Sequence, residues 1–398
     1  MRKPMRVLFL VPDFPDPPDR IKGGIQSAVL NLLKGFESLP IDVKVVSISR
    51  DTDNEYRRQL YSNVEVIYVP EGPAPLSFVN YFLHCSRAVR NIIKEYKPDI
   101  IHFEEGMNFL LIRFFAHKRY KHVLTIHGIT FAEAKLKKYW KQRMKWYMNG
   151  IVERVMLPPH VIHISKYSKN IFSRLIREKA PIIFNAVGNS YFPIPELKAT
   201  GNRLLYVGVI NRRKNLMSLL KVLDRLQQKG CAFTLDIVGD FDESEKYREE
   251  VLPFVAARGL SQRVNFLGWK TQEDLIELYT NHDIVVLPSL QETLPVVIAE
   301  AMSAARVMVT TDVGGIPEMI DHGKDGFIYQ KHQEDQLEGI LMELFNNHEL
   351  VSEVGAAARR SANRKFHCRV IAEKTFNYYQ LLHLSESGES ESVFNPSV

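Results

Sequence analysis

Two glutamates eight residues apart are the clearest candidates for chemistry in this 398-residue sequence. Glu292 lies in a loop after a short apolar strand, and Glu300 lies within a helix predicted at 294–304. A carboxylate among Val, Ile, Ala and Met is costly unless it is hydrogen-bonded. A ribose offers two adjacent hydroxyls, and each such bond contributes roughly 1.5–3 kcal/mol. Backbone N–H groups near Leu294 also favour an anion such as a diphosphate. The residues alone leave open that Glu292 caps the helix and Glu300 faces solvent.

Three consecutive cations, Arg212, Arg213 and Lys214, lie between a predicted strand at 203–209 and a predicted helix at 215–229. Positive charge at this point suits a diphosphate, because the charge of such a leaving group must be stabilised in the transition state. Each side chain could equally be a solvated surface group. The cluster therefore indicates a candidate anion site.

Two further candidates follow predicted strands in the first half of the chain. Gly23 and Gly24 lie between a strand at 5–11 and a helix at 25–38. Paired glycines let the backbone approach a ligand closely, although a bare pair is also typical of a turn. His127 ends another strand, and ligands of open α/β sheets bind at the carboxyl ends of strands. His127 is therefore a site candidate, with a structural histidine as the alternative.

Together these segments resemble the GT4 family of retaining glycosyltransferases, which have the GT-B fold. The spacing of Glu292 and Glu300 matches the family's E-x7-E signature, and the likeness continues through 307–318 and 325–327. The resemblance implies that Glu300 binds the ribose of a nucleotide and that Glu292 binds hydroxyls of the donor sugar. It also implies metal-independent transfer without a cofactor, since the nucleotide sugar is a substrate.

The same resemblance assigns roles to the other candidates. Lys214 matches a family lysine six residues after a glycine, here Gly208, and would stabilise the leaving diphosphate. The Gly23-Gly24 loop would touch the donor phosphate and sugar, and His127 would contact the sugar. No residue is an evident nucleophile. The resemblance therefore implies front-face attack, in which the leaving phosphate accepts the proton of the acceptor.

Two positions in loops of the second half, each close after a glycine, depart from the family pattern. Val209 stands where the family has an arginine, so Arg212 or Arg213 would have to supply that charge. Phe241 replaces a family glycine. These departures leave room for a chain that kept the fold and lost the activity.

The loop before the second glutamate departs as well. The family has Phe-Gly where this sequence has Leu294-Pro295. A proline has no N–H to donate. Backbone contacts to a donor phosphate would therefore have to come from Leu294 or Val296.

The elements that must position these residues alternate between strands and helices in both halves. Short β-branched runs separated by helical patterns are typical of βαβ units and a parallel sheet. We expect an α/β chain of two Rossmann-like doubly wound domains that face a cleft: 1–190 for the acceptor and 191–368 for the nucleotide sugar. The resemblance adds a helix at 369–384 that crosses back to the first domain. A Ser/Glu-rich tail at 385–398 is expected to be disordered.

Composition is that of a soluble globular protein, with 45% hydrophobic and 25% charged residues. Three separate cysteines argue against a disulfide framework or a zinc ribbon and fit a reducing cytosol. No apolar window approaches the roughly 18 residues of a membrane span. The N-terminal apolar run is too short for a signal peptide, so we expect a cytoplasmic protein. The absence of G-x-G-x-x-G and Walker A motifs argues against a dehydrogenase and a P-loop ATPase.

Charge is unevenly distributed along the chain. Residues 1–200 contain 31 Lys+Arg and 18 Asp+Glu, a balance of +13, whereas 201–398 contain 21 and 28, a balance of −7. Within 113–147, ten cations accompany one acid, and a predicted helix interleaves them with aromatic residues. That pattern suits contact with an anionic membrane surface, with a solvated helix as the alternative. No nucleic-acid module is visible.

We therefore expect a retaining glycosyltransferase that moves a sugar from a nucleoside diphosphate sugar to a hydroxyl acceptor. By resemblance the acceptor is lipid-linked or a glycan, in cell-surface polysaccharide or glycolipid biosynthesis, which fits peripheral contact with the cytoplasmic face of a membrane. Two alternatives remain: a non-catalytic scaffold subunit of the same fold, and another enzyme of that fold, such as an epimerase or a phosphorylase that would bind pyridoxal phosphate. Two D-x-D triplets, at 51–53 and 240–242, are attributed to coincidence rather than to a metal site.

Overall fold

A computed structural model gives the structure of the chain. Within the 398 residues it describes the following segments: 3–18, 20–21, 23–49, 52–71, 85–104, 120–135, 140–155, 157–176, 180–196, 202–243 and 246–384. The tail at 385–398, which the sequence predicts to be disordered, lies outside the described residues. So does much of the basic stretch at 113–147.

The first domain is a seven-stranded sheet in the order β3-β4-β2-β1-β5-β6-β7. All neighbours are parallel except β3, which pairs antiparallel with β4 at the edge. Its strands are β1 Met5–Pro12, β2 Ile41–Ser49, β3 Tyr56–Tyr61, β4 Val64–Pro70, β5 Ile100–Phe103, β6 Lys121–Ile126 and β7 His160–His163. Its described helices are α1 Gly24–Phe36, α3 Ser86–Tyr96, α5 Thr130–Ala134, α6 Trp140–Val155 and α7 Lys166–Phe172.

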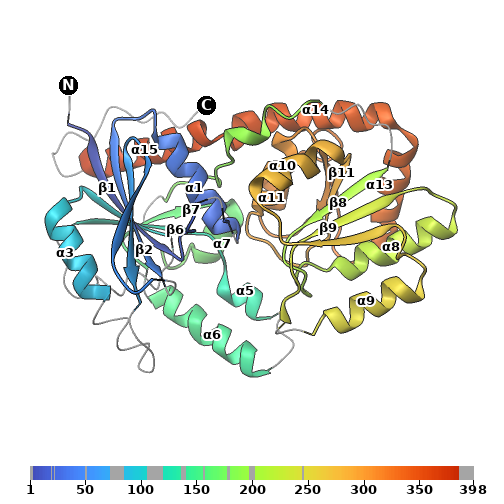
Figure 1. Ribbon diagram of the computed structural model, residues 1–398, viewed down its shortest axis with the longest axis horizontal. Helices are drawn as coiled ribbons and strands as arrows, with labels where there is room; N and C mark the ends of the chain where they lie inside the picture. The colour runs from blue at the N-terminus through green and yellow to red at the C-terminus, as the bar shows by residue number, and fades with distance from the viewer. Residues whose placement is uncertain are drawn as a thin grey trace.

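The second domain is a six-stranded parallel sheet in the order β10-β9-β8-β11-β12-β13. Its strands are β8 Arg203–Val207, β9 Thr234–Val238, β10 Val264–Gly268, β11 Ile284–Leu287, β12 Val307–Thr311 and β13 Phe327–Tyr329. Its helices are α8 Leu216–Gln228, α9 Arg248–Ala257, α10 Gln272–Asn281, α11 Val296–Ser303, α12 Ile316–Met319, α13 Glu334–Asn346 and α14 His348–Lys365. The prediction of two doubly wound α/β domains is confirmed (Figure 1).

The strands form because their apolar runs are covered on both sides. Residues 7–11 of β1 and 284–287 of β11 are almost completely buried. Parallel sheets carry helices on both faces, so their strands read as continuous apolar runs. The edge strand β3 escaped prediction because Arg57 and Arg58 are exposed and give it a polar sequence.

The chain crosses between the domains twice, and the two connecting segments lie side by side. The N–H of Val187 donates to the carbonyl of Phe366 (2.9 Å), and the N–H of Cys368 donates back to Val187 (3.1 Å). Helix α15, Cys368–Leu384, then packs on α1 of the first domain. The contact is close, because a Cβ on Gly35 would lie 2.3 Å from the carbonyl oxygen of Cys368. Figure 1 shows α14 and α15 running along one edge of both domains.

The strand order fixes where a ligand can bind. In each sheet the order reverses beside the first strand: between β1 and β5 in the first domain, and between β8 and β11 in the second. Ligands of open α/β sheets bind beyond the carboxyl ends of the strands at such a switch point. Gly23 and Gly24 lie in the segment after β1, Lys214 in the one after β8 and Glu292 in the one after β11, whereas His127 follows the neighbouring strand β6.

Candidate active site

Glu292 is held by two cations and a hydroxyl. Its side chain is 6% exposed. Lys214 Nζ lies 2.6 Å from Oε1, Arg213 donates to Oε2 at 3.3 Å, and Ser289 Oγ donates to Oε1 at 2.8 Å. Burial acts to raise the pKa of Glu292, but Lys214 and Arg213 outweigh it and hold the pKa below its usual range. The carboxylate is therefore ionised and fully paired.

Arg213, and not Arg212, is the arginine that joins this cluster. Arg212 is turned away, where it pairs with Glu250 and lies 5.4 Å from the ring centre of Tyr247. Val209 is exposed and offers no charge. Of the two arginines that could replace the missing one, Arg213 is therefore the one that lies beside Glu292.

Glu300 is buried within α11 and is not a solvated helical residue. It accepts hydrogen bonds from Tyr279 (3.2 Å), from Tyr191 and, across the domain boundary, from Ser27 of α1 (3.4 Å). Burial raises the pKa of Glu300 to about 7, and these hydrogen bonds oppose the shift. Its carboxylate is therefore poised to change charge near neutral pH.

The glycine loop lies against the start of α11. Helix α1 begins at Gly24, and a Cβ on that residue would lie 3.6 Å from Cγ2 of Val296. The side chains of Leu294 and Val296 are buried, so only their backbone could face a ligand. Pro295 caps the helix start without a side-chain hydrogen bond, and Glu292 does not cap it.

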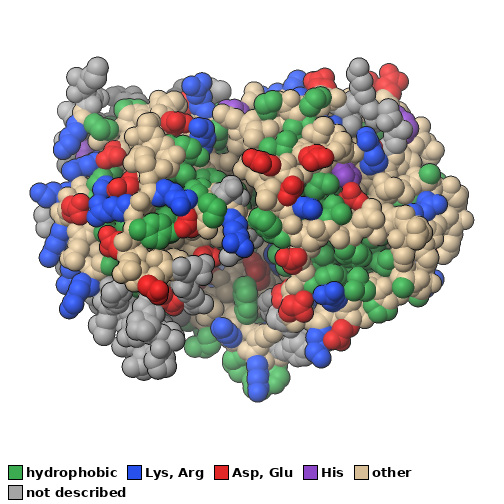
Figure 2. Space-filling view, viewed as in Figure 1, with side chains coloured by type: hydrophobic (Ala, Val, Ile, Leu, Met, Phe, Trp, Pro, Cys, Tyr) green, Lys and Arg blue, Asp and Glu red, His purple; other side chains and the backbone are tan. Residues whose placement is uncertain are grey.

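His127 lies on the first-domain side and is hydrogen-bonded to Glu104. Its Nε2 is 2.6 Å from Oε2 of Glu104. Glu133 of α5 also lies near this side, close to Gly128. Burial lowers the pKa of Lys214, and the charge of Glu292 and, more weakly, that of Glu133 oppose this shift. Figure 2 shows a hollow between the two halves of the molecule, with charged side chains around it.

The structure therefore brings the candidates together in two groups. Lys214, Arg213 and Glu292 form one cluster, and Glu300 with the glycine loop forms the other. His127 is hydrogen-bonded to Glu104, and among the described residues it makes no hydrogen bond to Glu292.

Sequence reasoning missed several members of the site. They are Glu104, Ser27, Asn185, Tyr191, Tyr279 and Ser289. Glu104 had a signal, because it follows β5 as His127 follows the neighbouring β6. The tyrosines had none, since only the fold brings them to Glu300.

No metal cluster was found in the part of the chain that the structure describes: no group of three or more His, Cys, Asp or Glu side chains there could hold an ion. Asp51 of the first D-x-D triplet lies outside the described residues. The positive charge beside Glu292 comes from Lys214 and Arg213.

Comparison with protein families matches both domains. Residues 22–188 match the model "Glycosyltransferase Family 4", and residues 189–361 match "Glycosyl transferases group 1". The two matches meet between residues 188 and 189, within the segment that connects the domains.

Two of the relatives match this chain over most of their own length. An uncharacterized glycosyltransferase of Methanocaldococcus jannaschii is 25% identical over 84% of this chain and 88% of its own. The O-antigen chain mannosyltransferase B of Escherichia coli is 24% identical over 77% of this chain and 81% of its own.

Solved structures share the fold. Sucrose-phosphate synthase from Thermosynechococcus elongatus has a TM-score of 0.82 at 17% identity, over 96% of this chain and 100% of that one. Anabaena HepE in complex with UDP-glucose has a TM-score of 0.72 at 20% identity, over 95% and 100%. With both family models matched, two parallel-sheet domains and the E-x7-E glutamates in the second, this chain belongs to the GT4-type glycosyltransferases of GT-B fold.

Proposed function

We propose that this glycosyltransferase is a retaining enzyme that transfers a sugar from a nucleoside diphosphate sugar to a hydroxyl acceptor. The observation that supports this most is the buried cluster of Lys214 and Arg213 around Glu292, with Glu300 eight residues further on, inside α11. Two fixed cations match a diphosphate, and two carboxylates match the hydroxyls of a sugar and a ribose.

In this proposal the two cations act on the leaving group. Lys214 and Arg213 stabilise the charge that develops on the diphosphate as its bond to the sugar breaks. The acceptor oxygen forms its bond to the anomeric carbon on the same face, and its proton passes to the departing phosphate oxygen. Glu292 accepts hydrogen bonds from sugar hydroxyls and orients the ring.

No metal ion is needed in this mechanism. Lys214 and Arg213 supply two positive charges, and the N-terminus of α11 adds backbone N–H groups and a favourable dipole at Val296. EDTA should therefore leave the transfer rate unchanged. A requirement for Mg²⁺ or Mn²⁺ would contradict the proposal.

Glu300 would take the ribose after the domains separate slightly. The contact from Ser27 is long, at 3.4 Å, and crosses from one domain to the other. Opening the cleft would break it and free one carboxylate oxygen for the ribose hydroxyls. Tyr191 and Tyr279 would continue to hold the other side of the carboxylate.

The first experiment measures thermal stability against UDP, GDP, ADP, TDP and CDP at about 1 mM. A nucleotide with a dissociation constant near 10 μM would stabilise the fold by roughly 2.7 kcal/mol. We expect a shift with one nucleotide, which Glu300→Ala abolishes. UDP is the first choice, because the similar Anabaena structure contains UDP-glucose.

Two further measurements complete the test. NMR of the product made with the matching nucleotide sugar would give its anomeric configuration, and inversion would contradict the retaining mechanism. No thermal shift with any nucleotide would instead favour a scaffold subunit without catalysis.

The first domain, which we propose binds the acceptor, carries an exposed apolar stripe on α6. Trp140, Met144, Met148, Ile151 and Val155 are 48–67% exposed. Their spacing of three or four residues places them on one face of the helix. The structure finds no described helix long and apolar enough to cross a bilayer.

The surroundings of this stripe match an anionic membrane. Lys141, Arg143 and Lys145 are exposed beside it, and Figure 2 shows basic and hydrophobic side chains together at the edge where Figure 1 places α6. The helix is fixed from behind, because a Cβ on Gly150 would lie 2.6 Å from the ring of Phe131. We propose that the stripe docks on the surface of an anionic bilayer, where a lipid-linked glycan would be presented.

Liposome flotation tests this contact. We expect binding that depends on anionic lipid and is lost in Met144→Glu/Met148→Glu. Leu175→Glu, an exposed apolar residue outside the stripe, is the matched control and should bind normally. Equal flotation of all three proteins would remove the membrane proposal and leave the donor proposal intact.

A further inference from the structure

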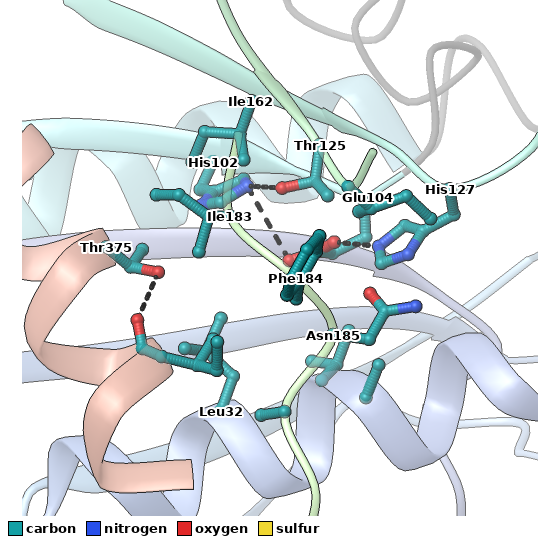
Figure 3. Close-up of a pocket in the computed structure, with 15 residues that line it drawn as sticks. Leu32, His102, Glu104, Thr125, His127, Ile162, Ile183, Phe184, Asn185 and Thr375 are labelled. Carbon is teal, nitrogen blue, oxygen red and sulfur yellow. Dashed lines mark hydrogen bonds and ion pairs between the residues drawn. The ribbon is translucent and has the colours of Figure 1, made fainter. Parts of the chain in front are cut away.

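Behind His127, four polar side chains form a buried network at the ends of two neighbouring strands (Figure 3). His102 and Glu104 belong to the end of β5, and Thr125 and His127 to the end of β6. The two strands are parallel, with Phe103 opposite Leu124. Residues two apart in a strand share a face, so all four side chains project to the same side of the sheet.

The network continues to the helix that crosses back from the second domain. Tyr379 of α15 is hydrogen-bonded to Nδ1 of His102, and Nε2 of His102 is 2.7 Å from Oγ1 of Thr125 and 3.6 Å from Oε1 of Glu104. All of these groups are buried. Glu104 is therefore fixed by contacts on both sides, with His102 on one and His127 on the other.

Burial determines where the protons lie in this network. Burial raises the pKa of Tyr379 well above its usual range and lowers the pKa of His102 to about 4. At pH 7 the Tyr379 hydroxyl therefore donates to a neutral His102, whose Nε2–H donates to Thr125. Burial acts against ionisation of Glu104, but the hydrogen bond to His127 acts in the opposite direction, and the pKa of Glu104 lies below its usual range.

An ionised carboxylate only accepts hydrogen bonds. His127 must therefore donate from Nε2 across the 2.6 Å contact to Glu104. Its other nitrogen, Nδ1, is then a bare acceptor whenever the ring is neutral. This nitrogen is buried and has no hydrogen-bond partner among the residues that the structure describes.

A small pocket lies beside this nitrogen. Its volume is about 30 Å³, and its lining includes Glu104, Thr125, His127 and Asn185, enough room for one hydroxyl or one water. Figure 3 shows the ring of His127 and the amide of Asn185 turned toward each other. Asn185 donates to the carbonyl of Leu294, in the loop between β11 and α11, at 3.4 Å. The pocket therefore borders the proposed donor site.

We propose that Glu104 is a positioning residue for His127: it fixes the imidazole as the Nε2–H tautomer and presents Nδ1 as an acceptor for a hydroxyl of the donor sugar. His102, Thr125 and Tyr379 keep Glu104 in place. The sugar role of His127 rests on the proposed function, whereas the tautomer is a property of the protein alone.

Histidine NMR tests the tautomer without any substrate. Long-range ¹H–¹⁵N spectra of ¹⁵N-histidine protein at about pH 8 distinguish the two tautomers, and His127→Asn identifies the signals of that ring. We expect the Nε2–H form in the native protein. In Glu104→Gln the carboxamide both donates and accepts, so we expect a mixture of tautomers.

Kinetics test the consequence for catalysis. We expect kcat for sugar transfer to fall about 10- to 100-fold in Glu104→Gln, by analogy with residues that orient metal-bound histidines, while the donor KM changes much less. Glu338→Gln is the matched control: this carboxylate is also buried, although it lies in helix α13, and it is paired with Arg225 and Lys229. It should change neither the His127 spectrum nor kcat.

The outcomes separate the two proposals. An unchanged tautomer or an unchanged kcat in Glu104→Gln overturns the positioning role, even if the enzyme transfers sugar normally. The expected tautomer change, in a protein that transfers no sugar from any donor, supports the positioning of His127 and refutes the proposed function.

Discussion

Replacing Glu300 by glutamine should stabilise the second domain above pH 7 and change little near pH 5. The structure raises the pKa of this buried carboxyl to about 7, chiefly through burial. An unfolded glutamate titrates near 4.5. Between these values the unfolded state binds fewer protons, so stability falls as pH rises from about 4.5 to about 7 and is level above.

The size of this loss follows from the shift. Each pKa unit corresponds to about 1.4 kcal/mol, so ionisation of Glu300 removes about 3 kcal/mol by pH 8. Glutamine has no charge to bury and still accepts hydrogen bonds from Tyr279 and Tyr191. We therefore expect Glu300→Gln to be more stable than the native chain by up to about 3 kcal/mol at pH 8, and by less than about 1 kcal/mol at pH 5.

Urea unfolding at pH 5, 6, 7 and 8 measures this difference. Trp269 is the tryptophan of the second half of the sequence, so a Trp140→Phe/Trp146→Phe background lets fluorescence report that domain. Glu338→Gln is the control and should not remove the pH slope. If the difference in unfolding free energy between Glu300→Gln and the native chain is the same at pH 8 as at pH 5, the ionised Glu300 carboxylate does not lower the stability of the native chain.

Three further predictions follow from individual contacts. Lys214→Ala should destabilise the fold, by less than the about 3–5 kcal/mol of a fully unpaired buried charge, because Arg213 still pairs with Glu292; urea unfolding of Lys214→Ala/Glu292→Gln should show part of that loss recovered. Gly314→Ala should prevent stable folding, because φ is +63° and a Cβ would lie 1.6 Å from the carbonyl oxygen of Glu292; near-normal melting would contradict this. Tyr279→Phe removes a donor to Glu300, so the stability loss should continue to higher pH than in the native chain, and an unchanged midpoint would argue against that bond.

The sequence predicts the apolar, buried strands and the residues that follow their carboxyl ends. Residues 7–11 of β1 and 284–287 of β11 are unbroken apolar runs, so their place as buried strands follows from the sequence pattern. Their carboxyl ends point directly to Gly24, His127 and Glu292. The edge strands are harder to predict from the sequence. Strand β3 is polar, and β13, with three residues, is too short to show a pattern.

Contacts across the domain boundary could not be predicted, because no local pattern encodes them. Ser27 is an ordinary polar residue in α1 until the fold brings it to Glu300. Arg212 and Arg213 are neighbours of identical type, and only the packing of Tyr247 and Glu250 around one of them decides which reaches Glu292.

The domain boundary beside the site is held by few polar contacts. Trp269 donates to the carbonyl of Ile21 (3.0 Å), Glu318 accepts from the N–H groups of Lys166 and Tyr167 (2.7 and 2.9 Å), and Ser27 reaches Glu300. Each such bond contributes about 0.5–1.5 kcal/mol net, so opening the cleft costs only a few kcal/mol in polar terms. Under the proposed function, a nucleotide sugar that replaces these bonds with its own would enter and close the same cleft. Because the covalent connections lie together at Val187 and Phe366, such opening would be a hinge motion about that edge of the molecule.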